Sequence, residues 1–88
     1  MALIILNNMK LTILAFGITR DILGTSELNL ELPESARVED LKAELARRFP
    51  AFANLSALAI AVNSQYAELN LELKERDEVA LIPPVSGG

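Results

Sequence analysis

One stretch decides the fold: residues 38–49 read VEDLKAELARRF. Apolar side chains recur at every third or fourth position along it and form a single stripe. This stripe consists of Val38, Leu41, Leu45 and Phe49. Acidic residues near the start and basic residues near the end both favour the helix dipole, and Pro50 ends the pattern. The stretch therefore predicts one amphipathic helix, with Ser35 as its cap.

Segments that alternate between apolar and polar residues lie on both sides of this helix and predict β-strands. The predicted strands are residues 9–16, 26–32, 57–63, 66–67 and 78–82. A short helical turn is expected at residues 18–23, ending at Gly24, and a loop at residues 50–56. We expect the last strand beside the first, in the middle of the sheet. The order predicts an α+β fold, the ubiquitin-like β-grasp, in which one main helix packs on one face of a mixed four- to five-stranded sheet.

Composition excludes several classes of function. The 88 residues carry eight Lys and Arg against twelve Asp and Glu, a net charge of −4, which argues against a nucleic-acid partner. Cysteine and histidine are absent, which removes thiol nucleophiles, disulfides, zinc fingers and the Ser-His-Asp triad. We predict no metal site and no permanently bound cofactor. No apolar run approaches the roughly 20 residues of a membrane span, so we expect no membrane contact. Nothing in the composition points to the cell exterior, so we expect a cytoplasmic location.

The length allows one small domain. Residues 9–82 are expected to form it, after an N-terminal extension at residues 1–8 and before a flexible tail at residues 83–88. The sheet face turned away from the helix should be polar, yet its predicted residues are largely apolar. These residues are Leu14, Phe16, Ala59, Ala61, Ala80 and Ile82. They predict a surface on which a partner docks, although single exposed apolar residues are also normal.

The C-terminal tail is built to present its own carboxylate. It reads Pro83-Pro84-Val85-Ser86-Gly87-Gly88. Two prolines keep its base extended, and the two terminal glycines lack the Cβ that would keep a chain end out of a narrow slot. The carboxylate of Gly88 becomes reactive when it is adenylated, because AMP is a good leaving group. Sulfur can then displace AMP and leave a thiocarboxylate, and this chemistry needs no side chain of the protein.

Residues 73–88, LKERDEVALIPPVSGG, resemble the end of the small subunit of molybdopterin synthase. Residues 14–24, LAFGITRDILG, and the helix around residues 38–45 are similar to the same family. The resemblance implies a sulfur carrier whose Gly88 is adenylated by a ubiquitin-activating-like adenylyltransferase that uses ATP, and is then loaded from a sulfur donor protein. It implies that the tail enters the large synthase subunit and gives sulfur to cyclic pyranopterin monophosphate, within a heterotetramer of two small and two large subunits.

The chain departs from this family at three places. Leu81 and Ile82 stand where aromatic residues often precede the two prolines. Arg76 stands where a glycine is usual, and Ser64 stands where glycine often follows the asparagine. These changes bear on turn strain and on the fit to a partner, and they leave the carboxylate chemistry unchanged.

Three other functions remain open. One is the thiazole-forming sulfur carrier of thiamine synthesis, one is a ubiquitin-like modifier joined to lysines through Gly88, and one is an interaction domain with an inert tail. Catalysis by the chain alone is disfavoured, because the adjacent acids Asp77 and Glu78 point to opposite faces of a strand. Arg47 and Arg48 are interpreted as a solvated helix end and not as an anion site.

Overall fold

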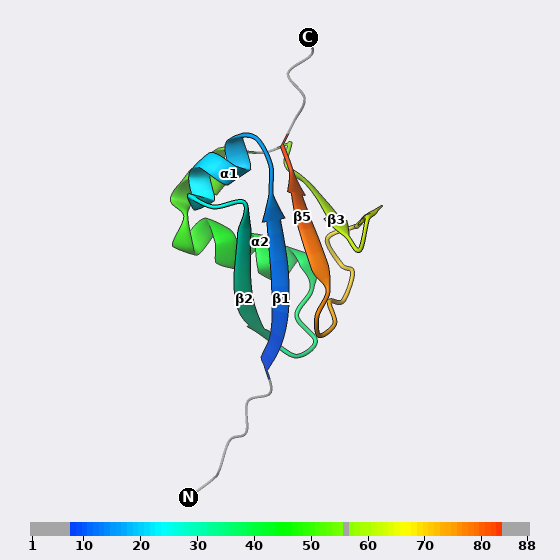
Figure 1. Cartoon of the computed structure of the whole chain (residues 1–88). Coiled ribbons are helices and arrows are strands. Elements are labelled where there is room, and N and C mark those ends of the chain that lie inside the picture. Colours follow the sequence, from blue (N-terminus) through cyan, green and yellow to red (C-terminus); the bar gives the residue numbers. More distant parts are fainter. Residues whose placement is uncertain (1–7, 56, 84–88) are drawn as a thin grey trace, which may run out of the picture.

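The computed structural model describes residues 8–55 and 57–83, which contain five strands and three helical segments (Figure 1). In chain order they are β1 (Asn8–Ala15), α1 (Ile18–Leu23), β2 (Glu27–Pro33), α2 (Val38–Arg48), the 3₁₀ helix η1 (Pro50–Asn54), β3 (Ala59–Val62), β4 (Gln65–Tyr66) and β5 (Glu78–Ile82). Residues 1–7 of the predicted extension and residues 84–88 of the predicted tail lie outside the described part. Asn8, placed in the extension by the sequence, pairs with Pro33 and belongs to β1.

The strands form a mixed sheet in the order β2-β1-β5-β3-β4. β2 runs antiparallel to β1, and β3 runs antiparallel to both β5 and β4. β5 lies parallel to β1 in the middle of the sheet, as Figure 1 shows. The α+β fold and the central position of the last strand are therefore confirmed. Parallel neighbours need a long crossover, and α2 lies within the segment that joins β1 to β5.

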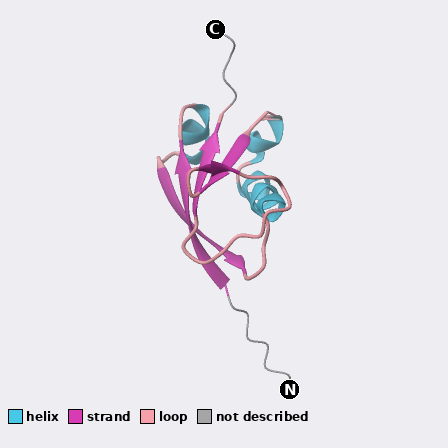
Figure 2. Ribbon diagram, turned by 90° about the vertical axis from the view of Figure 1, so that its right-hand side faces the viewer, coloured by secondary structure: helices cyan, strands magenta, loops and turns pink. Residues whose placement is uncertain are grey.

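The core lies between α2 and one face of the sheet, so the molecule has two layers (Figure 2). The helix stripe is buried as predicted: Val38 and Leu41 are 0% exposed and Leu45 is 1% exposed. The strands meet it with alternate residues, among them Met9, Leu11, Ile13, Leu30, Ile60, Val79 and Leu81. Each large aliphatic side chain buried here stabilises the fold by about 1.5–3 kcal/mol.

The start of α2 differs from the prediction. Ser35 lies in a turn with a φ of 72°, and the N-cap residue is Arg37. The carboxylate of Asp40 accepts a hydrogen bond of 2.8 Å from the backbone N–H of Arg37. An acidic side chain of the first turn therefore accepts the hydrogen bond of the N-cap amide. The prediction that Ser35 caps this helix is wrong.

The segment after α2 is also more regular than predicted. Pro50, expected to open a loop, starts the helix η1, because its fixed φ suits a first helical position. Phe52 is 6% exposed, and its ring meets that of Phe49 edge to face at a centroid distance of 6.2 Å. This contact holds the described part of the predicted loop against the core.

Besides the turn of Ser35, two further turns place non-glycine residues in the left-handed region of backbone space. Asn63 and Ser64 form the two-residue connection between β3 and β4, with φ values of 51° and 71°. Positive φ at both positions is the geometry of a type I′ hairpin, which favours glycine at the second. Arg76 has a φ of 68° in the turn before β5. Ser64 and Arg76 are the two turn positions at which the chain departs from the family pattern, so both carry backbone strain.

We predict that Arg76→Gly raises the free energy of unfolding by about 0.5–1 kcal/mol. Glycine removes a left-handed penalty of about 1–2 kcal/mol, and its greater freedom in the unfolded chain offsets part of the gain. Urea unfolding measures the change as a higher midpoint at unchanged slope. Lys74→Gly is the matched control, because Lys74 is in the same turn at negative φ and should lose stability. Equal destabilisation by both variants would contradict the prediction.

Candidate functional site

The outer face of the sheet, turned away from α2, carries an apolar row across four strands. Leu14 of β1 pairs with Ala80 of β5. Ala61 of β3 pairs with Ala80 on one side and with Tyr66 of β4 on the other. Directly paired residues of neighbouring strands point to the same face, so these four side chains form one row.

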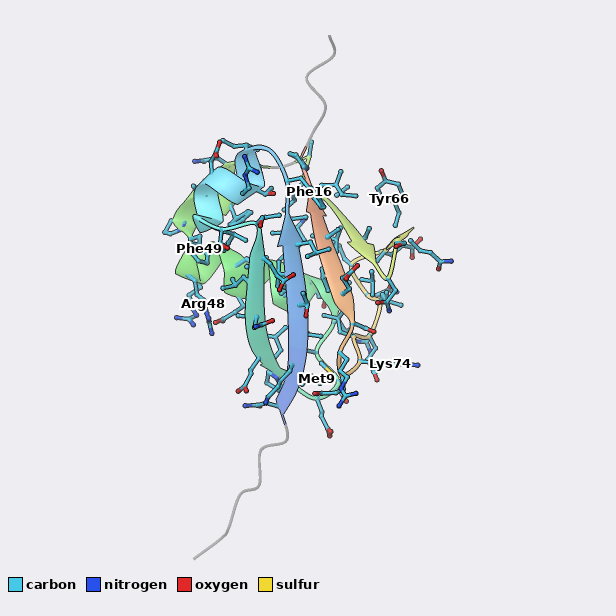
Figure 3. The ribbon with its side chains drawn as sticks, in the orientation of Figure 1. Met9, Phe16, Arg48, Phe49, Tyr66 and Lys74 are labelled. Atoms are coloured by element: carbon cyan, nitrogen blue, oxygen red, sulfur yellow. The ribbon has the colours of Figure 1, made fainter. Side chains whose placement is uncertain are left out.

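A second apolar row lies beside the first, nearer the end of β5. Ile82 pairs with Ala59, and Phe16 follows directly after the last residue of β1. In the opposite direction the face becomes polar, because the next pair is Thr12 with Glu78. Figure 3 shows Phe16 and Tyr66 toward the end of the sheet where β5 ends, and Met9 and Lys74 toward the other end. We call the apolar half the outer patch: Leu14, Phe16, Ala59, Tyr66, Ala80 and Ile82.

The aromatic side chains of the outer patch are well exposed. Phe16 is 52% exposed and Tyr66 is 77% exposed, while Leu14, Ala59, Ala80 and Ile82 are half-buried. Exposure on this scale in one contiguous apolar area is typical of a binding surface. The sequence pattern found five of these six residues.

The prediction that Ala61 belongs to the exposed docking surface is wrong. The sequence pattern also missed two exposed apolar residues, Tyr66 and Ile18. Ala61 lies on the predicted face but is only 6% exposed, because its small side chain sits between the strands of Ala80 and Tyr66. Tyr66 lies in a strand of two residues, too short to show alternation. Ile18, 47% exposed, opens α1 two residues after Phe16. The sequence feature that could have pointed to Tyr66 and to Ile18 is a large apolar residue next to a turn.

The root of the tail lies at the same end of the sheet as the outer patch. β5 ends at Ile82, and Pro83 follows as the last described residue. Gly17 packs close to it: a Cβ built on Gly17 would lie 3.4 Å from Cγ of Pro83. Gly17 also has a φ of 55°, which a side chain would strain. The predicted site residues Pro84, Val85, Ser86, Gly87 and Gly88 lie outside the described part, so their roles stay predictions.

The acidic pair Asp77 and Glu78 serves the turns beside β5. The carboxylate of Asp77 accepts hydrogen bonds from the side-chain amide of Asn63 at 2.9 Å and from the backbone N–H of Lys74 at 2.8 Å. The backbone N–H of Glu78 donates to the side-chain oxygen of Asn63 at 3.0 Å. These bonds lock two turns together, and that the pair is no general acid and base stays a prediction.

Arg47 and Arg48 at the end of α2 both pair with Glu44. The nearest distances between their nitrogens and its carboxylate oxygen are 2.6 Å. Hydrogen bonds from the two guanidinium groups lower the pKa of Glu44 to about 2, and the bond to Glu44 raises the pKa of Arg47. The two arginines therefore belong to a helix-end ion pair on the surface, and the interpretation against an anion site agrees with this geometry.

A surface hollow of about 650 Å³ lies on the polar half of the outer face, away from the outer patch. Lys10 and Arg76 line it together with Glu31, and the carboxylate of Glu75 accepts a bond from the backbone N–H of Lys10. The lining itself carries two basic side chains and one acidic one, and Glu75, bonded to the backbone of Lys10, brings the local charge to zero.

The described residues hold no cluster of acidic side chains that could bind a metal ion. None of the described helices is long and apolar enough to cross a bilayer. The predicted cytoplasmic location and the predicted lack of a bound cofactor stay predictions.

Comparison with known proteins identifies the family. Residues 13–88 match the ThiS family. The molybdopterin synthase sulfur carrier subunit of Chlamydomonas reinhardtii is 36% identical over 83 residues, covering 91% of this chain and 100% of that protein. A Pyrococcus furiosus structure, provisionally named molybdopterin converting factor subunit 1, is 35% identical with a TM-score of 0.82, covering 88% of this chain and 99% of its own.

A solved complex of subunits 1 and 2 of the molybdopterin-converting factor from Helicobacter pylori contains a further relative. Its matching chain is 31% identical with a TM-score of 0.62, covering 91% of this chain and 100% of its own. The resemblance to the small subunit of molybdopterin synthase is thereby confirmed, and so is the β-grasp fold. The chain belongs to the ThiS family.

Proposed function

We propose that this chain is the sulfur carrier subunit of a molybdopterin synthase, with the carboxylate of Gly88 as its reactive group. One observation carries the proposal: the family match extends to residue 88, so it includes the terminal Gly87-Gly88. The Chlamydomonas reinhardtii relative, matched over its whole length, is a carrier of this kind by name. Because this chain has no cysteine and no histidine, its α-carboxylate is the group that it can present for sulfur loading.

Loading takes two substitutions, both catalysed by partner proteins. A carboxylate oxygen of Gly88 attacks the α-phosphorus of ATP, and pyrophosphate leaves. A hydrosulfide ion supplied by a donor protein then attacks the carbonyl carbon, AMP leaves with the bonding electrons, and the S–H proton is lost to solvent. The product is a thiocarboxylate, which is ionised at neutral pH because a thioacid is much more acidic than an alkyl thiol. The carrier thus needs ATP only through its activating enzyme.

Delivery takes place in the large synthase subunit. The sulfur of the thiocarboxylate attacks a carbon of cyclic pyranopterin monophosphate and displaces an oxygen leaving group there. Water then cleaves the C(O)–S bond, which leaves the sulfur on the pterin and restores the carboxylate of Gly88. Two deliveries build one dithiolene, which fits a heterotetramer of two small and two large subunits. The Helicobacter pylori complex, which joins subunits 1 and 2, supports a large-subunit partner for this chain.

The outer patch suits this partnership because it lies at the root of the tail. A surface that docks near Ile82 and Pro83 holds the start of the tail at a fixed distance from the partner's active site. Six residues extended from Pro83 to Gly88 reach roughly 20 Å at about 3.3 Å per residue. Docking and insertion therefore act together, and docking lowers the entropy cost of placing the carboxylate.

We predict that deleting Gly88 abolishes sulfur loading and leaves the fold intact. The core residues of the described part lie between Met9 and Leu81, so removing a residue beyond them should leave this core unchanged. Intact mass spectrometry measures loading after incubation with ATP, the activating enzyme and a sulfur donor. The full chain should gain the mass difference between sulfur and oxygen, and the shortened chain should gain none.

Other outcomes of this measurement would favour another function. Loading of the shortened chain, which ends in the carboxylate of Gly87, would contradict the requirement for Gly88 as the reactive terminus. An isopeptide adduct of the full chain with a second protein would favour the ubiquitin-like modifier, and no change would favour the inert domain. A pull-down that captures a thiazole synthase in place of the large subunit would favour the thiamine role.

We predict that Phe16→Asp and Tyr66→Asp each weaken binding to the large subunit at least tenfold. Each change places a charge in an apolar contact, and truncating or charging a central aromatic residue of an interface typically costs about 2 kcal/mol or more. Titration calorimetry measures the dissociation constants. Gln65→Asp is the matched control, because Gln65 is exposed in the same two-residue strand and points to the other face. If Gln65→Asp weakens binding as much as Tyr66→Asp, the outer patch is not the docking surface.

A further inference from the structure

Thr19 is the one polar side chain among the described residues that is fully buried, at 0% exposure. Its hydroxyl accepts a hydrogen bond of 2.8 Å from the backbone N–H of Phe16. It lies 2.6 Å from the carbonyl oxygen of Phe16 and 3.3 Å from that of Leu81, and its single proton is donated toward these two oxygens. One hydroxyl therefore ties the turn after β1 to the last strand, across 62 residues of sequence.

These contacts lie where the pairing of the two central strands ends. The last pair between β1 and β5 is Ala15 with Leu81. β1 ends at Ala15 and α1 begins at Ile18, so backbone pairing between β1 and β5 stops while β5 continues to Ile82. Beyond the last backbone pair, the hydroxyl of Thr19 connects the two strand ends. A side-chain hydroxyl there takes the place that a backbone amide has within the sheet.

The two backbone segments held by this hydroxyl carry residues that a partner would meet. Phe16 is the exposed aromatic residue of the outer patch at this end, and Leu81 is followed directly by Ile82 and the tail root at Pro83. Gly17, between Phe16 and Thr19 in the same turn, packs against Pro83. We propose that Thr19 is a positioning residue, which sets the place of Phe16 relative to the tail root and so determines how well the activating enzyme captures the chain. This inference rests on the proposed function.

Loss of the hydroxyl should disturb this turn and spare the core. The backbone N–H of Phe16 would lose its acceptor in a part-buried place, so the turn would have to move or admit water to satisfy it. The main core contacts of α2 with the sheet do not involve Thr19. The expected defect is therefore local: a misplaced Phe16 and a less firmly held end of β5.

The test uses the full chain with three single variants. Thr19→Val removes the hydroxyl and keeps the branched shape, and Thr19→Ser keeps the hydroxyl. Thr25→Val is the matched control, because the hydroxyl of Thr25 bonds only with backbone groups of Glu27. The readouts are KM and kcat for adenylation by the activating enzyme, amide hydrogen exchange at Phe16 and Leu41, and the carbonyl ¹³C shift of Leu81.

We expect Thr19→Val to raise KM roughly fivefold to tenfold at unchanged kcat, the size of effect that one lost hydrogen bond gives. Exchange at Phe16 should accelerate by a larger factor than at Leu41, and the Leu81 carbonyl shift should move. Thr19→Ser should restore all three, and Thr25→Val should change none. An unchanged KM, or equal acceleration at Phe16 and Leu41, would show a merely structural role and overturn the proposal.

Failure of the proposed function gives a different result. If the wild-type chain forms no adenylate with ATP and the enzyme, the carrier function falls. Exchange at Phe16 and the Leu81 carbonyl shift then decide the positioning role alone: a local response to Thr19→Val supports it, and a uniform response refutes it.

Discussion

The parallel pairing of β1 and β5 is the constraint on which the rest of the structure depends. It brings the last strand of the chain beside the first and places both in the middle of the sheet. Ile13, Val79 and Leu81 of these two strands are 0% exposed, so the pairing is held by the core as well as by backbone hydrogen bonds. A strand with neighbours on both sides has a fixed end, and here that end is the root of the tail.

Because side chains alternate along each strand, one side of the sheet is buried and the other faces outward. Residues at odd positions of β1 and β5 meet α2 and make the core, and the even positions face outward. Outward residues are polar along half of the strands and apolar along the half that ends at Pro83. The outer patch and the root of the tail therefore share the strand β5.

The chemistry assigned to this chain places few demands on its side chains. Under the proposed function its reactive group is a backbone terminus, so the domain supplies position and partner proteins supply catalysis. A domain of 88 residues has a small core and a small stability margin. Backbone strain at Ser64 and Arg76 reduces that margin, because glycine would adopt the same positive φ without strain. Both residues lie in turns remote from the tail root.

The sequence by itself determined the features that local periodicity encodes. The helix stripe, the alternating strands, the order of elements and the Gly-Gly end are all visible in short windows, because each window carries its own pattern of apolar residues. The absence of cysteine and histidine limited the chemistry in the same direct way. Only the tertiary structure decided which residues meet. Cross-strand register buried Ala61 and brought Tyr66 beside it, and long-range contact gave Thr19 its bond to Leu81. Such contacts join distant positions in the chain, so no local pattern specifies them.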